Sequence, residues 1–96
     1  MLIRSQDKEQ LLNIDSVKTI GICERGKCFA IFIDSLYFIG NYSSREKIIK
    51  VLDMIQEAYS EYQIMLNFSV SYLHEFKEKT DGFAIFQMPE DSEVEA

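Results

Sequence analysis

The sequence predicts an α+β fold, in which an antiparallel β-meander packs one face on a single long helix and a C-terminal strand returns to the sheet. Residues 43–63 carry apolar side chains at helical spacing, with no Gly or Pro among them. Residues 17–40 form extended apolar runs separated by two turn signals. A last apolar run, 83–88, ends at Pro89, which cannot donate to a strand ladder.

Composition favours one domain, which we assign to residues 1–89, because 96 residues with 47% apolar content suffice for one core. This part holds ten basic and twelve acidic side chains, so its net charge is only −2, which disfavours nucleic acid as a partner. Residues 90–96 hold the other four acids and are predicted to be a disordered acidic tail. No apolar run approaches the roughly 20 residues of a membrane span, so we expect a cytoplasmic protein with no membrane partner.

Short strands are predicted at 2–4, 11–14 and 17–23, with polar turns between them. The strand at 17–23 is predicted to form a hairpin with a strand at 28–34. The four-residue loop between them, 24–27, includes Gly26 for a position of positive φ.

That loop length predicts the hairpin register and the two faces of the sheet. It places Cys23 opposite Cys28, Ile22 opposite Phe29, and Ile20 opposite Ile31. The heavier face, assigned to the helix, carries Ile20, Ile22, Phe29, Ile31 and Ile33. The second face carries Val17, Thr19, Gly21, Cys23, Cys28, Ala30 and Phe32. We interpret the two cysteines as half-buried thiols, although a cross-strand pair is the alternative.

The helix follows a third strand at 36–40, and Ser43 with Glu46 predicts a capping box at its start. Its buried face would carry Ile48, Val51, Leu52, Ile55, Tyr59 and Tyr62. Its outer side carries an acidic ridge, formed by Asp53, Glu57 and Glu61. The like charges at Glu57 and Glu61 cost roughly 0.2–0.5 kcal/mol, so the ridge is either a solvated helix face or a site for a basic partner.

Residues 64–79 fit two patterns. Apolar residues alternate from 64 to 72 as in a strand, whereas Phe68, Tyr72 and Phe76 form a helical stripe. The Lys- and Glu-rich residues 74–79 favour a second short helix. This segment either covers the second sheet face or leaves it free as a partner or oligomer surface, for which Val17, Thr19 and Phe32 are the candidate residues.

No catalytic or metal site is predicted. His74 is the natural candidate for a general base, but no nucleophile motif accompanies it. A zinc site would need two ligands beyond Cys23 and Cys28, and His74 supplies only one. We therefore expect a non-enzymatic protein without a cofactor.

Three stretches carry a resemblance to a known family: residues 3–8, the pair of segments 42–44 and 51–55, and residues 86–89 before the acidic end. Together they resemble a small family of uncharacterised proteins from phages and prophages of low-GC Gram-positive bacteria. The resemblance implies a phage accessory protein, forming a small homo-oligomer, that binds and inhibits a host protein such as a component of a defence system. It carries over no catalytic residue.

Two alternatives stay open within this context. One is an oligomeric sponge that sequesters a nucleotide immune signal, which needs basic donors to converge with an aromatic ring such as Tyr37 or Phe32. The candidate donors are Arg4, Lys18, Arg25 and Lys27. The other is a virion or morphogenesis component.

Overall fold

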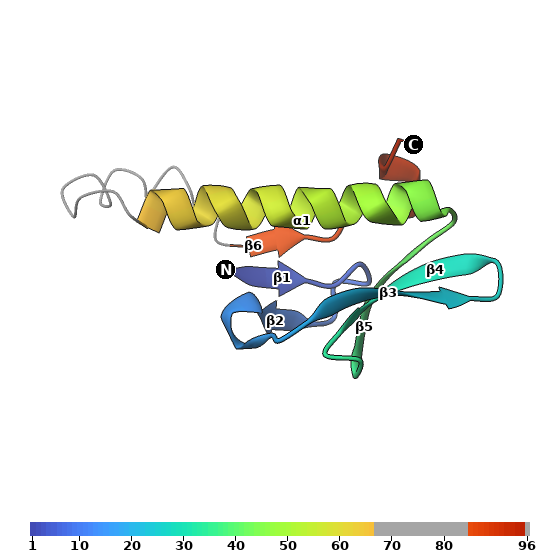
Figure 1. The fold of residues 1–96 in the computed structure, drawn as a ribbon, viewed down its shortest axis with the longest axis horizontal. Coiled ribbons are helices and arrows are strands. Elements are labelled where there is room, and N and C mark those ends of the chain that lie inside the picture. Colours follow the sequence, from blue (N-terminus) through green and yellow to red (C-terminus); the bar gives the residue numbers. More distant parts are fainter. Residues whose placement is uncertain (67–84, 96) are drawn as a thin grey trace.

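The computed structural model describes residues 1–66 and 85–95 and shows two small sheets that share one helix (Figure 1). The first sheet has the order β2-β1-β6 and the second the order β3-β4-β5. The strands are β1 (Leu2–Arg4), β2 (Leu11–Asn13), β3 (Ile20–Arg25), β4 (Cys28–Ile33), β5 (Tyr37–Tyr42) and β6 (Ile85–Gln87). The helix α1 spans Arg45–Leu66, and short 3₁₀ helices span Ile14–Ser16 and Asp91–Glu93.

The predicted α+β class, with its meander and long helix, is confirmed. The meander is β3-β4-β5, antiparallel throughout, and the returning strand β6 pairs in parallel with β1. The strands divide into two sheets because β1 pairs with β2 on one side and with β6 on the other, and not with the meander.

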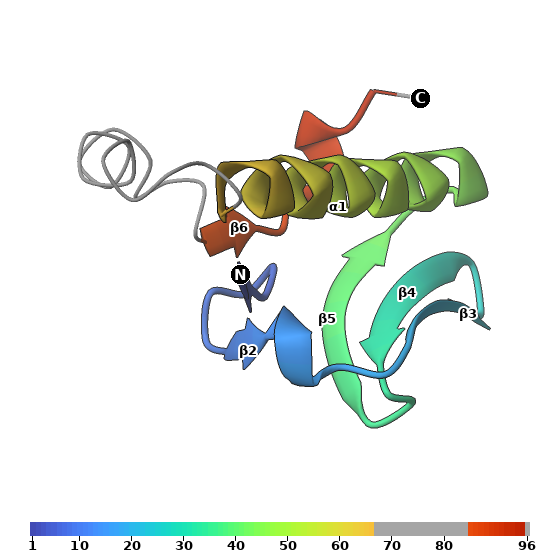
Figure 2. The same ribbon diagram turned by 60° about the vertical axis from the view of Figure 1, so that its left-hand side comes forward.

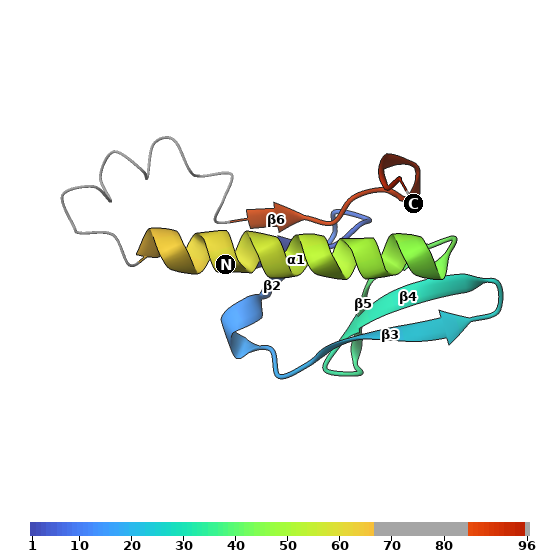
Figure 3. The same ribbon diagram turned by 45° about the horizontal axis from the view of Figure 1, so that its top comes forward.

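The core lies between α1 and the inner sides of both sheets (Figures 1 and 3). The helix contributes Ile48, Val51 and Ile55, which the helical spacing predicts to be buried. The strands and the ends of the chain contribute Met1, Ile3, Ile31, Ile33, Ile39, Tyr42, Met88 and Val94. The hydrophobic effect on this contiguous set holds the two sheets against one helix.

The predicted register of the hairpin is wrong by two residues. Arg25 pairs with Cys28, so the loop contains only Gly26 and Lys27. Gly26 has φ of 62°, as a tight hairpin turn requires. Cys23 therefore opposes Ala30 and not Cys28, and both cysteines are free.

The other predicted pairs shift with it: Ile22 opposes Ile31, and Ile20 opposes Ile33. A two-residue shift leaves the side chains of β3 and β4 on their predicted sides of the sheet.

An irregularity in β5 sets which of its side chains enter the core. Ile31 pairs with Gly40 but Phe32 pairs with Phe38, so the register shifts between them and Ile39 is the extra residue. Ile39 is buried in the core, whereas Phe38 is exposed.

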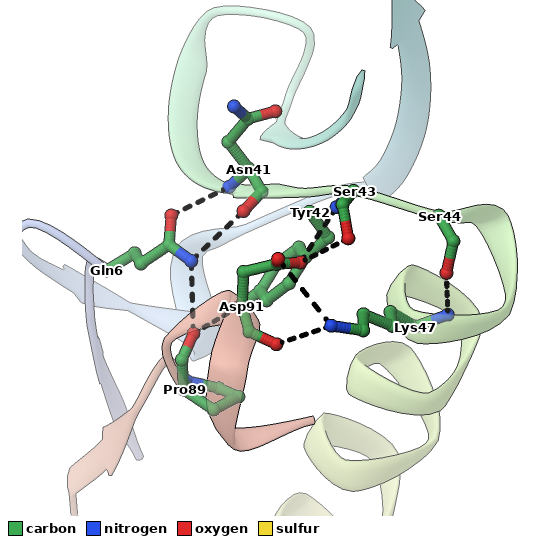
Figure 4. Close-up of polar contacts among 8 residues, drawn as sticks. All are labelled: Gln6, Asn41, Tyr42, Ser43, Ser44, Lys47, Pro89 and Asp91. Atoms are coloured by element: carbon green, nitrogen blue, oxygen red, sulfur yellow. Dashed lines mark hydrogen bonds and ion pairs between the residues drawn. The ribbon is translucent and has the colours of Figure 1, made fainter. Parts of the chain in front are cut away.

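The helix start also differs from the prediction. The N–H of Lys47 donates to Oγ of Ser44 at 3.2 Å, so Ser44 is the N-cap and the predicted Ser43–Glu46 capping box is wrong. Ser43 instead donates both its N–H, at 2.8 Å, and its hydroxyl, at 3.0 Å, to one carboxylate oxygen of Asp91 (Figure 4).

The acidic end, predicted to be disordered, is ordered through residue 95. Val94 is buried in the core, and Nζ of Lys47 donates to the carbonyl of Asp91 at 2.9 Å. The Asp91 carboxylate lies beside the first residues of α1, where the positive end of the helix dipole favours an anion. The tail is thus part of the folded domain.

Gln6 joins the two sheets (Figure 4). Its backbone N–H donates to the carbonyl of Ile39 at 2.8 Å. Its side-chain amide accepts from the N–H of Asn41 at 2.9 Å and donates to the carbonyl of Asn41 at 3.1 Å, as a peptide group in a ladder would. The same amide donates to the carbonyl of Pro89, which also accepts the hydroxyl of Tyr42.

Of the ambiguous segment 64–79, residues 64–66 complete α1. His74 and the aromatic residues Phe68, Tyr72 and Phe76 lie outside the described residues, as does the predicted helix at 74–79.

Acid should weaken the attachment of the C-terminal segment. The hydrogen bonds from Ser43, with the charge of Lys47, hold the pKa of Asp91 below its ordinary value of 3.8. A depressed pKa contributes stability that is present above the ordinary value and is lost as pH falls through the folded value. We expect urea denaturation of wild type and Asp91→Asn to differ at neutral pH and to converge below about pH 4.

The comparison between the two proteins isolates the effect of Asp91 from that of Asp7, which among the described carboxylates also has a lowered pKa. Asp7, held by the hydroxyl of Ser5 and the N–H of Glu9, titrates in both proteins and so cancels from the difference. A difference that stayed constant down to pH 2 would contradict the role of the Asp91 charge.

Candidate functional site

The side of the meander that faces away from the core carries exposed and aromatic side chains. Alternation along each strand places them opposite to Ile31 and Ile33, which are buried. We call this surface the outer face. Its residues include Thr19, Gly21, Cys23, Arg25, Phe32 and Phe38, and the half-buried Cys28 and the buried Ala30 lie on the same side of β4. In Figure 2, β3, β4 and β5 form a curved sheet below α1, and the outer face is its side away from the core.

Three side chains of the outer face contact one another. The rings of Phe32 and Phe38 meet edge to face, with centroids 5.7 Å apart and planes inclined by 62°. The guanidinium carbon of Arg25 lies 5.8 Å from the centroid of the Phe38 ring. An exposed cation–π contact of this kind contributes about 0.5–1 kcal/mol, which restrains Arg25 over the ring.

A shallow hollow of about 240 Å³ lies beside this cluster. Its walls are Thr19, Gly21, Ile22, Cys23, Phe32 and Ser35. Ligand pockets usually have volumes of about 300–1,000 Å³. The hollow therefore suits one inserted side chain better than a whole small-molecule ligand.

The structure corrects one residue of the predicted partner surface. Thr19 and Phe32 lie on the outer face as predicted, but Val17 precedes β3 and packs against the core. The prediction failed because it extended the strand back to residue 17, whereas the 3₁₀ helix Ile14–Ser16 ends there.

The acidic ridge lies on the exposed side of α1. Asp53, Glu57 and Glu61 are all exposed, and the buried residues of the helix lie on its opposite side. Within residues 1–66 and 85–95, none of the three forms an ion pair. The ridge and the outer face are thus on opposite sides of a two-layer molecule.

The basic residues proposed for a nucleotide do not converge within this chain. Arg4 is in the other sheet, where its Nε donates to the carbonyl of Lys8 at 3.1 Å. Lys18 precedes Thr19 at the end of the sheet where Ile20, Ile33 and Tyr37 align. Arg25 and Lys27 are at the hairpin loop, at the other end of β3.

Arg25 does contact an aromatic ring, but the ring is that of Phe38, whereas Tyr37 and Phe32 were the rings predicted from the sequence. The β5 irregularity, which sends Phe38 outward beside Phe32, has no signal in the hydrophobic pattern.

In the part of the chain that the structure describes, no group of three or more His, Cys, Asp or Glu side chains is arranged to hold a metal ion. No helix there has both the length and the apolar character needed to cross a membrane.

The fold and its surfaces define an α+β protein with an exposed aromatic sheet face and an acidic helix ridge. No family model matches the sequence, and neither a curated protein nor a solved structure gives a significant match.

Proposed function

We propose that this chain is a non-enzymatic phage or prophage accessory protein that binds a host protein and inhibits it by covering part of its surface. The observation that supports binding to a protein is the outer face, where the exposed Arg25 and Phe38 form one contiguous cluster with the half-buried Phe32. Aromatic residues and Arg are enriched at protein interfaces, and the few residues that dominate binding energy are often of these types.

The outer face has the chemical character of an interface for a protein partner. Phe38 is 40% exposed, and Leu36, in the turn before β5, is also exposed, so apolar area is available for burial. The hollow beside Phe32 accepts one apolar side chain of the partner, and Arg25 offers donors to a carboxylate at its edge.

The acidic ridge is a second candidate surface, for a basic partner. Because it lies on the opposite side of the molecule, one flat interface does not include both surfaces. Variants of the outer face and variants of the acidic ridge therefore separate the contributions of the two surfaces to binding.

The test compares capture of a host protein by immobilised variants of the chain. Phe38→Asp places a charge in the aromatic cluster, and we expect the affinity for the captured protein to fall by about a hundredfold, as for a central interface residue. Leu11→Asp is the matched control, because Leu11 is 56% exposed but lies in the other sheet. Undiminished binding by Phe38→Asp, with the purified partner, would remove the outer face from consideration.

Replacing Glu57 and Glu61 together by Lys tests the ridge in the same assay. Both side chains are exposed, so the fold should be preserved, and capture through the ridge should be abolished. Capture equal to that of wild type would mean that the ridge is only a solvated helix face. A nucleotide retained by the chain in native mass spectrometry, with no host protein, would instead favour the sponge.

A further inference from the structure

The strand β3 borders its sheet and has one neighbour, β4, among the described residues. Figures 2 and 3 show β3 at the margin of the meander, with β4 on one side of it. The pairing with β4 runs without a bulge from Ile20 to Arg25, and β3 contains no Pro. Bulges and Pro are common means by which an edge strand avoids pairing with another chain. Glu24 is on the same side of β3 as Ile20 and Ile22, but it is exposed at the end of the strand and does not enter the core.

The hydrogen bonds show which backbone groups of β3 point away from β4. The N–H of Asp34 donates to the carbonyl of Thr19 at 2.9 Å, so the polar groups of Thr19 point toward β4. Direction alternates along an antiparallel strand, so Gly21, Cys23 and Arg25 also point toward β4. The N–H and C=O groups of the other three residues point to the free edge: Ile20, Ile22 and Glu24.

We propose that this free edge pairs antiparallel with the same edge of a second copy of the chain, about a two-fold axis at Ile22. Ile22 then pairs with Ile22 of the second copy, and Ile20 of each copy pairs with Glu24 of the other. Each of these three pairs exchanges two N–H···O=C bonds. The two meanders become one continuous sheet.

This register is selected over its neighbours by hydrogen bonding and by charge. With an axis at Gly21 or at Cys23, one residue of each β3 whose backbone groups point to the free edge would have no partner in the β3 of the other copy. An axis at Glu24 would set two Glu24 side chains against each other, which is destabilising. The axis at Ile22 instead places Glu24 diagonally from Lys18 of the second copy, so that two complementary charge contacts form.

The apolar side chains at the edge also gain from this pairing. Ile20 and Ile22 face the core but are only half-buried, because no strand lies beyond them among the described residues. A second β3 places another Ile22 beside each of them. The two-fold axis is perpendicular to the sheet, so both outer faces lie on the same side of the dimer.

A cysteine at position 21 tests the pairing and its register together. Gly21 would face Cys23 of the second copy in a pair without direct hydrogen bonds, with Cα atoms about 4.5 Å apart. That distance is within the range of a disulfide. A Cβ added to Gly21 meets nothing within 4 Å, and its φ is not positive, so Gly21→Cys should fold.

The experiment oxidises Gly21→Cys in a Cys28→Ser background with diamide, which accepts the two electrons and two protons of each disulfide. We expect a covalent dimer, with a peptide map that links position 21 of one chain to Cys23 of the other. Cys28→Ser alone is the control. A Cys23–Cys23 link in that control, or no intermolecular link at all, would overturn the proposed register.

Sedimentation of the unmodified chain and of two Glu24 variants tests dimer formation independently. Glu24→Pro removes an N–H that points to the free edge and not to β4, whereas Glu24→Ala keeps it. We expect a dimer for wild type, and a dimerisation constant weakened at least about tenfold more by Pro than by Ala. A monomeric wild type, or equal effects of Pro and Ala, would overturn the proposal. Neither experiment depends on a host partner.

Discussion

Replacing Tyr42 by Ala should lower the free energy of unfolding by about 4 kcal/mol, as large-to-small changes at buried aromatic residues do. Tyr42 is 1% exposed and, among the residues that the structure describes, has the largest fully buried side chain. Its hydroxyl donates to the carbonyl of Pro89 at 2.7 Å, which fastens the C-terminal segment to β5. Since domains are stable by about 5–15 kcal/mol, this change removes much of the total.

Urea denaturation of two further variants separates the contribution of the Tyr42 ring to the free energy of unfolding from that of its hydroxyl, and compares a buried tyrosine with an exposed one. Tyr42→Phe keeps the ring and removes the hydroxyl, and should cost about 1 kcal/mol, because Gln6 still donates to Pro89. Tyr37→Ala is the matched control at a half-exposed position, with an expected change within about 0.5 kcal/mol. Equal losses for Tyr42→Ala and Tyr37→Ala would show that Tyr42 is not a core residue.

The hydrogen bond of Tyr42 should persist across the working range of pH. Burial, with the nearby charges of Glu90, Asp91 and Glu93, raises the pKa of the Tyr42 hydroxyl well above its ordinary value of 10.0. The group therefore stays protonated and continues to donate at neutral and mildly alkaline pH.

The sequence predicted best where the pattern is local. The helix and its buried residues Ile48, Val51 and Ile55 follow from a period of 3.6 residues, which needs no knowledge of the partner surface. The faces of β3 and β4 were also predicted correctly, because a strand alternates with a period of two.

Loop length was less predictable. A two-residue and a four-residue loop both include Gly26, and they differ by a shift that keeps each side chain on its face. Hydrophobicity therefore does not distinguish them.

The interactions that were missed join residues far apart in the chain. Gln6 bonds to Asn41, and Asp91 to Ser43, across 35 and 48 positions, and neither pair has a signature in composition. Four acids in a short segment predicted disorder, although Val94 among them is buried.

In the candidate site, too, local patterns were predictable and the pairing of strands was not. Alternation placed Thr19 and Phe32 on the outer face, whereas Phe38 lies there only because of the β5 irregularity, and Val17 packs against the core.

Gly40→Val should lower the free energy of unfolding by about 3 kcal/mol, the upper end of the usual cost of overpacking and less only than the loss expected for Tyr42→Ala. A Cβ at position 40 would lie 3.0 Å from Cε2 of Tyr42, 3.3 Å from its hydroxyl and 3.1 Å from Cε of Met88. The end of the Met88 side chain can move, but the Tyr42 ring is held by its bond to Pro89. The two methyl groups of Val would force that ring to shift and break the bond.

A matched pair of Ala substitutions separates this crowding from the general effect of replacing a glycine in a strand. Gly21→Ala has open space around its Cβ, so it should be neutral or stabilising, by up to about 1 kcal/mol, because it reduces the entropy of the unfolded chain. Gly40→Ala gains the same entropy but meets Tyr42, and should be less stable than Gly21→Ala. In the background of Tyr42→Ala the ring is absent, so the Gly40→Ala penalty should largely vanish. A penalty that persisted there would place its origin in the β5 backbone or in contact with Met88, and not in contact with Tyr42.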